Sequence, residues 1–266
     1  MRTGGYFWGA LLVLVGVLLL LSNFGLLASD SWNYLWPLLL IILGVWALFA
    51  PRRRSRRGVV AARSVAVPLG AALRASLHLR HGAGRLQVQA GANPGELVSG
   101  TAAGGANVTF RTEGDLLQAE VLGTGEPQSF PARWEGRGYD WSLNLSDAVP
   151  LTLRVETGAS ETRLDLSALQ VTHLELRTGA SSTEVVLPAH AGSTRAHVQS
   201  GAASVRIRVP EGVGASIKVG SGLAAVNVDT TRFPRVGEEY RSLDYGTAAS
   251  SVDLQVDTGV GAVSIS

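Results

Sequence analysis

Cysteine is absent from this sequence of 266 residues, which excludes disulfide bonds and thiolate metal sites. Net charge is also scarce: 23 lysines and arginines against 21 aspartates and glutamates leave a formal charge of only +2, which gives no support for nucleic-acid binding. No Gly-x-Ser-x-Gly stretch occurs, and the five histidines show no compact metal-ligand spacing. The sequence therefore predicts a protein that is not an enzyme, with no cofactor, no metal and no small-molecule substrate.

Two long apolar runs fill the N-terminal part of the chain. The first covers residues 6–27 and the second residues 32–50, with a short polar break at 29–31 between them. At about 1.5 Å per residue, each run is long enough to cross a bilayer core as a helix. We therefore expect a transmembrane helical hairpin over residues 1–50. The alternative is a cleaved signal peptide, which the second apolar run directly after the first disfavours.

Aromatic residues and arginines mark the two ends of the second apolar run. Aromatic rings favour the headgroup level, and the run opens with Trp32, Tyr34 and Trp36. The run is followed by the stretch PRRRSRR, which contributes Arg52, Arg53, Arg54, Arg56 and Arg57. We expect a basic juxtamembrane linker over residues 51–70 that contacts anionic membrane lipids. Because basic flanks stay cytoplasmic, two spans would place both termini and the rest of the chain in the cytoplasm.

A repeat of Thr/Ser-Gly pairs dominates the C-terminal half. The pairs fall at residues 157–158, 178–179, 200–201, 221–222 and 258–259, and the first three intervals are 21, 22 and 21 residues. Each unit contains two runs that alternate apolar and polar residues. This pattern predicts an all-β domain over residues 71–266, a parallel β-solenoid with coils of about 21 residues and two strands each. The last interval of 37 residues is interpreted as a repeat with an insertion.

The parts of each repeat carry more detailed expectations. The glycine of each pair is expected to supply a backbone conformation that other residues resist, and the small residue after it to let neighbouring coils approach. Facing charges should set the register, with Arg154 opposite Glu175. One buried apolar column is expected to contain Leu164, Val185, Ile207, Val226 and Val263.

Two irregular segments interrupt the alternating runs, at residues 126–141 and 232–246. Loops on a regular scaffold often hold binding residues, and aromatic side chains among arginines suit contact with a partner. The candidate partner-binding residues are Phe130, Trp134, Tyr139, Trp141, Phe233 and Tyr240. The alternative is that they cover the ends and sides of the solenoid by packing.

The N-terminal stretch WGALLVLVGVLLLLSNFGLL, followed by SWNYLWPLLLIILGVWALF and arginines, resembles the paired-helix region of LiaI/LiaF-like membrane proteins. The later stretches VPLTLRVETGASETRLDLSALQV, LRTGASSTEVVLP and IRVPEGVGASIKVGSGLAAVNV resemble the toast-rack and LiaF C-terminal β-repeat domains. The resemblance implies a bacterial membrane protein that modulates a sensor kinase in cell-envelope stress. No catalytic residues carry over from it.

Three functions follow from these observations. The first is a non-enzymatic, membrane-anchored scaffold that engages another membrane protein such as a sensor kinase, for which the last strand, ending at Ser266, leaves an edge that pairs with another chain. The second is a self-assembling structural protein whose coils stack end to end between molecules. The third is a polysaccharide binder or enzyme, which requires the β domain to lie outside the cytoplasm.

Overall fold

The computed structural model describes residues 62–123 and 139–266, all of which belong to one compact unit, Arg57–Ser266. The expected transmembrane hairpin, its aromatic residues and the five arginines lie outside the described residues, as do Phe130 and Trp134. Within the described ranges, no helix is long and apolar enough to cross a bilayer.

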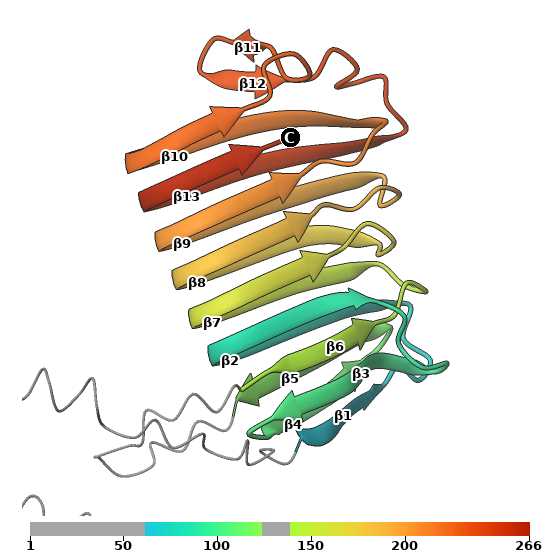
Figure 1. Cartoon of the computed structure of the whole chain (residues 1–266). Helices are drawn as coiled ribbons and strands as arrows, with labels where there is room; N and C mark the ends of the chain where they lie inside the picture. Colours follow the sequence, from blue (N-terminus) through green and yellow to red (C-terminus); the bar gives the residue numbers. More distant parts are fainter. Residues whose placement is uncertain (1–61, 124–138) are drawn as a thin grey trace, which may run out of the picture. The chain divides into compact units, whose positions relative to one another are not determined.

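Six long strands form the body of the domain. They are β2 (Arg74–Ala90), β7 (Leu151–Asp165), β8 (Val171–Val186), β9 (Ser193–Arg208), β10 (Val213–Val228) and β13 (Ser250–Ile265). They stack parallel to one another in the order β2-β7-β8-β9-β13-β10. Figure 1 shows each strand folding back midway, so that one strand supplies both faces of a coil. The predicted coils and their parallel stacking are confirmed, with the two runs of each coil joined in one bent strand.

The opposite end of the stack is built from shorter strands in mixed directions. Strands β5 (Leu116–Gly123) and β6 (Trp141–Leu145) continue the two halves of β2 in parallel. Three antiparallel strands then finish this end: β4 (Ala106–Glu113) on β5, and β3 (Glu96–Ala103) and β1 (Ala62–Pro68) beyond β6. A wholly parallel sheet is therefore the wrong description of this end. Strand β1 lies inside the expected linker of residues 51–70. Its Val65 and Val67 point inward and join the core, so this part of the linker belongs to the β domain.

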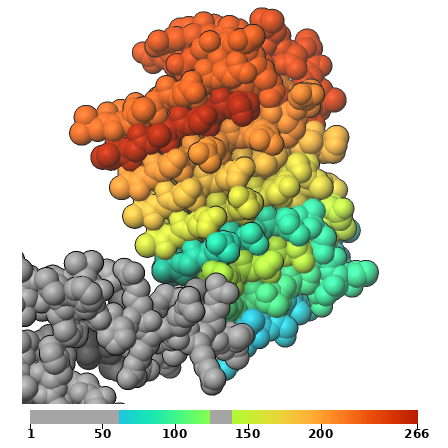
Figure 2. Space-filling model, in the orientation of Figure 1, coloured from blue at the N-terminus to red at the C-terminus, as the bar shows by residue number. Residues whose placement is uncertain are grey.

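The chain order and the spatial order differ at the C-terminal end. Strand β13 inserts between β9 and β10, so that Ile265 pairs with Ile207 on one side and with Val228 on the other. Figure 2 shows the red β13 between these two orange strands. The expected open edge at the last strand is therefore wrong, since β10 occupies the end of the stack. The insertion between β10 and β13 carries β11 (Arg235–Val236) and β12 (Glu239–Arg241), and β12 pairs with Ser216 and Ile217 of β10.

The core lies between the two halves of the bent strands. One buried column of apolar side chains, each 8% exposed or less, contains Leu164, Val185, Ile207, Ile265 and Val228. Val226 and Val263 were expected in this column but lie two residues earlier, in register with Val205. Stacking the coils makes these columns continuous, which a single coil could not achieve.

Candidate interaction surface

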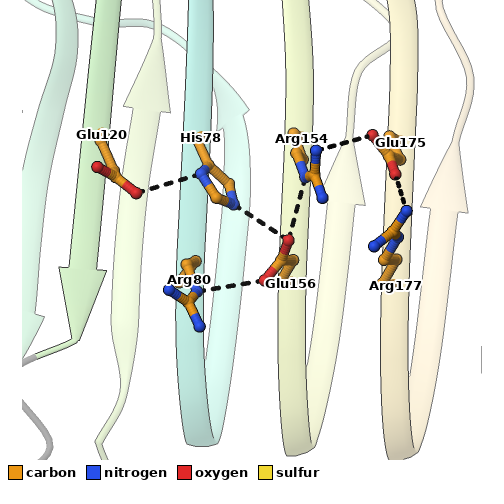
Figure 3. A network of polar contacts seen from close by, with 7 residues as sticks. All are labelled: His78, Arg80, Glu120, Arg154, Glu156, Glu175 and Arg177. Carbon is orange, nitrogen blue, oxygen red and sulfur yellow. Dashed lines mark hydrogen bonds and ion pairs between the residues drawn. The ribbon is translucent and has the colours of Figure 1, made fainter.

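A ladder of alternating charges runs across the outer face of the first half of the coils (Figure 3). Its centre is the carboxylate of Glu156 on β7, which lies 3.0 Å from Arg154 Nε, 3.2 Å from Arg80 Nε and 3.3 Å from His78 Nε2. The other ring nitrogen of His78, Nδ1, lies 3.3 Å from Glu120 on β5. Figure 3 shows His78 pointing between the two carboxylates, so that one imidazole joins three strands.

The ladder continues through Glu175 on β8. Its carboxylate lies 3.5 Å from Arg154 Nη1 and 2.7 Å from Arg177 Nη2. Arg154 faces Glu175 across neighbouring coils, as the repeat predicts. Opposite charges in adjacent strands stabilise one register and disfavour its neighbours.

Glu156 stays ionised within this network. Burial raises the pKa of its carboxyl, but the hydrogen bond from Arg154 and the charges of His78, Arg154 and Arg80 together lower the pKa below its ordinary value. The charges of the ladder therefore neutralise one another within the domain. We interpret the ladder as a device that sets register rather than as a surface that attracts a charged partner.

The Thr or Ser of each Thr/Ser-Gly pair faces the inside of the bend in β7, β8, β9 and β13, whereas Ser221 of β10 is exposed. The side chains of Thr157, Thr178, Ser200 and Thr258 are all 8% exposed or less. Ser200 Oγ donates to Thr258 Oγ1 over 2.9 Å, whereas Thr157 Oγ1 and Thr178 Oγ1 have no hydrogen-bond partner among the described residues. In β2 the position is held by His81, which pairs in register with Thr157.

Close approach between coils, rather than backbone conformation, requires the glycine of each pair. None of Gly158, Gly179, Gly201, Gly222 and Gly259 has a positive φ, so the expected reason is wrong. A Cβ atom on Gly158 would instead lie 2.4 Å from the Gly82 carbonyl oxygen, and one on Gly179 would lie 2.9 Å from that of Gly158. The glycines form a continuous ladder along the bend.

The residue after each glycine forms an exposed column on the outside of the bend. In register, this column contains Ala83, Ala159, Ala180, Ala202, Val260 and Leu223. Its members become larger toward the β10 end of the stack, where Val260 of β13 is 53% exposed and Leu223 of β10 is 83% exposed. Large apolar side chains in water, side by side on adjacent strands, are typical of interaction sites.

These two residues lie beside an open strand edge. Among the described strands, β12 covers only Ser216 and Ile217 of β10, so residues 219–228 of β10 pair on one side alone, with β13. A shallow groove of about 680 Å³ lies alongside and is lined by residues that include Gly220, Ser221 and Asp257. We define the open end as residues 219–228 together with Val260.

The predicted partner-binding aromatic residues that the structure describes have different surroundings. Trp141 is 2% exposed and Phe233 is fully buried, so both pack in the core as the alternative interpretation expects. Tyr139 is 43% exposed and Tyr240 is half-buried against the core. Among the described residues, no group of three or more His, Asp or Glu side chains could hold a metal ion. The open end was not identified from the sequence, although the change from alanine to Val260 and Leu223 was its signal.

His81 has an unusual environment at the start of the polar column. It is 3% exposed, its Nε2–H donates to the Tyr139 carbonyl oxygen over 2.7 Å, and its ring meets that of Trp141 edge to face at 5.1 Å. In the neutral ring the Nε2 proton leaves Nδ1 unprotonated, so Nδ1 is a buried acceptor without a described partner. Burial lowers the pKa of His81, and the Tyr139 hydrogen bond and the charge of Asp140 only partly oppose this.

Comparison with known proteins agrees with the architecture. Residues 7–74 match the LiaF transmembrane domain, which identifies a membrane protein, and residues 57–208 match the N-terminal domain of toast_rack. No curated protein matches the chain. Among solved structures, a proposed cell adhesion protein from Clostridium sporogenes shares the fold with a TM-score of 0.69 and 20% identity, over 77% of this chain and 98% of its own. The resemblance drawn from the sequence is confirmed, and because the toast_rack match covers more than half of its residues, this chain belongs to the toast-rack family.

Proposed function

We propose that this protein is a non-enzymatic, membrane-anchored scaffold that modulates cell-envelope stress signalling by engaging another membrane protein, such as a sensor kinase. Two features support the proposal. The LiaF-like segment supplies an anchor, and the toast-rack domain supplies a rigid body whose charged face is internally neutralised. A rigid body on an anchor is suited to holding a surface near a membrane partner.

The open end is the observation that carries this proposal. In the exposed column that follows the glycines, the described residues are alanines except for Leu223 and Val260, which pair on adjacent strands. These two residues lie at a strand edge with unpaired backbone groups. Exposed apolar side chains beside free N–H and C=O groups favour a partner that adds a strand or packs an apolar segment against the edge. We therefore place partner binding at this end of the domain.

An envelope-stress reporter in living cells tests the proposal. The double substitution Leu223→Ser and Val260→Ser should change the reporter response to a cell-wall-active antibiotic and lower recovery of the partner kinase from native membranes. Leu243→Ser is the matched control, because Leu243 is 92% exposed in the same C-terminal part of the domain but lies outside the open end. Equal responses from the double variant, the control and the unaltered protein would count against the scaffold function.

A second candidate function follows from the fold neighbour. That protein is described as a proposed cell adhesion protein, and adhesion requires an exposed domain outside the cell. A β domain outside the cytoplasm would also suit a polysaccharide binder. Our preferred topology, with two spans and the β domain in the cytoplasm, rests on the arginines at positions 52–57. A reporter fused after Ser266 that is active only in the cytoplasm separates the two, since lack of activity favours the adhesion-like function.

A further inference from the structure

We infer that the open end pairs with the same edge of a second copy of this chain, with the two β10 strands antiparallel. This inference rests on the proposed function and names a second copy as the direct occupant of the open end, so that the membrane partner is engaged by the paired scaffold. It assigns the free backbone groups of residues 219–228 to an intermolecular strand pair related by a two-fold axis.

The edges at the two ends of the stack are protected differently. At the opposite end, β4 carries Arg111 and Glu113, and β1 ends in Pro68 with an irregular pairing after Val67. Charges, proline and irregularities are the usual means by which proteins prevent edge-to-edge association. The run VGSGLAAVN at residues 219–227 of β10 contains no charge and no proline. Among the described edges, this stretch therefore lacks the protection that the other end shows.

The lack of charge also makes the edge complementary to itself. In a two-fold pair, a residue near the axis lies opposite or beside its own copy, so a charge near the middle of the run would face or neighbour a like charge. No such repulsion arises along residues 219–227. Lys218 and Asp229, which bound the run, carry opposite signs, so an antiparallel pair brings the acidic end of one copy toward the basic end of the other.

Antiparallel pairing is the arrangement that preserves the faces of the sheet. Beyond the bend, Ala224, Val226 and Val228 are the less exposed side, and Ala225 and Asn227 point to solvent. A two-fold axis perpendicular to the sheet keeps both inner sides together and makes the strands antiparallel. A parallel pair of the same edges would need an axis along the strands, which would place the inner side of one copy on the solvent side of the other.

The chain offers no described strand of its own for this edge. The last strand is already paired on both sides, since Ile265 lies between Ile207 and Val228. A second copy is a readily available partner, because anchoring in one membrane raises the effective concentration of copies toward one another. Pairing would also bring Leu223 and Val260 of one copy close to those of the other and remove apolar surface from water.

Cysteine crosslinking of the full chain in native membranes tests the inference, and because the natural sequence has no cysteine, the introduced thiol is the only one in each copy. The single variants Leu223→Cys, Ala225→Cys and Asn227→Cys would be treated with a thiol crosslinker that spans about 8 Å, the diagonal reach between neighbouring strands. We expect a covalent dimer of twice the chain mass at one or more of these positions. Thr109→Cys, on the exposed edge strand β4, is the matched control and should give only random collisions.

Charge variants separate edge pairing from misfolding. Added to the Leu223→Cys variant, Ala225→Lys should lower the dimer yield by about fivefold or more through like-charge repulsion. Ala225→Glu should lower the dimer yield to a similar extent. Co-expression of the Ala225→Lys and Ala225→Glu variants should restore the dimer. Ala225 is exposed, so neither charge enters the core. Loss without recovery in the mixture would contradict the inference.

The remaining outcomes are equally decisive. If no β10 position exceeds Thr109→Cys, the second-copy pairing is wrong. A crosslinked product that contains a different protein would also overturn it, while leaving the scaffold function intact. The scaffold function is judged separately by the stress reporter, so the two proposals fail in distinguishable ways.

Discussion

Gly158 lies so close to Gly82 that a Cβ atom on Gly158 would come within 2.4 Å of the Gly82 carbonyl oxygen. The relationship repeats along the stack, with the corresponding distances at 2.9 Å for Gly179 and 3.2 Å for Gly201. A backbone oxygen held in a coil cannot move aside as a flexible side chain can. Contact between coils therefore selects glycine at the bend.

Alanine substitutions along this ladder should show graded losses of stability. Gly158→Ala is expected to lower the free energy of unfolding by about 2 kcal/mol or more through overpacking, and Gly201→Ala by less. Gly82→Ala is the control, since a Cβ atom there meets nothing within 4 Å, and it should change stability by less than about 0.5 kcal/mol. Urea unfolding of the full chain in detergent, followed by tryptophan fluorescence, gives the three values. Equal losses at the three positions would refute the contact explanation.

Acid should destabilise the domain through His81. Burial lowers the pKa of His81 in the folded protein, whereas the unfolded chain restores an ordinary value near 6.5. As the pH falls through that ordinary value, the unfolded state gains a proton that the folded state resists, so stability decreases. Below the lowered folded pKa, this contribution levels off.

His81→Thr isolates this effect, because threonine is the residue that β7 and β8 carry at the equivalent position. The other four histidines remain in both proteins, so their contributions cancel in the difference. The melting temperature should be measured at about pH 7.5 and about pH 5.5, on either side of the ordinary histidine pKa. Between these two pH values it should fall more for the unaltered protein than for His81→Thr. A larger fall in the variant would have the wrong sign for a buried neutral imidazole.

The repeat predicted the interior of the stack well because its signal is local and periodic. Alternation fixes which side chains point inward, and the near-constant interval brings Leu164, Val185 and Ile207 into one column, as the structure confirms. The same alternation in the run WSLNL could have placed Trp141 in the core, since Trp141, Leu143 and Leu145 are all buried.

The order of the last two coils could not be read in the same way. Strands β10 and β13 both continue the alternating pattern, and the pattern is silent about which of them lies against β9. The longer connection at residues 229–249 allows β13 to enter between β9 and β10. The open end depends on this exchange of strand order, so the periodic pattern of the sequence could not predict it.

Removal of the Glu156 charge should destabilise the domain more than removal of an ordinary surface charge. Glu156→Gln leaves His78, Arg80 and Arg154 near one another without the carboxylate that they share. We expect a loss of about 1–2 kcal/mol, between the values for exposed and buried pairs. Glu161→Gln on the same strand is the control, since Glu161 contacts Arg85 in an exposed pair, and it should lose less than about 0.5 kcal/mol. Similar losses in urea unfolding would show that the network adds nothing beyond separate pairs.

The insertion of β13 gives a matched pair of valines with opposite expectations. Val226 and Val263 pair in register on adjacent strands, but Val263 is 1% exposed between β9 and β10 whereas Val226 is only partly buried at the edge. Val263→Ala should therefore lower the free energy of unfolding by about 2 kcal/mol, and Val226→Ala by less than about 1 kcal/mol. If the strands instead followed chain order, Val226 would be the interior residue and the two losses would be reversed. Urea unfolding of the two variants thus tests the strand exchange directly, and a reversed ranking would place β13 at the edge and remove β10 from it.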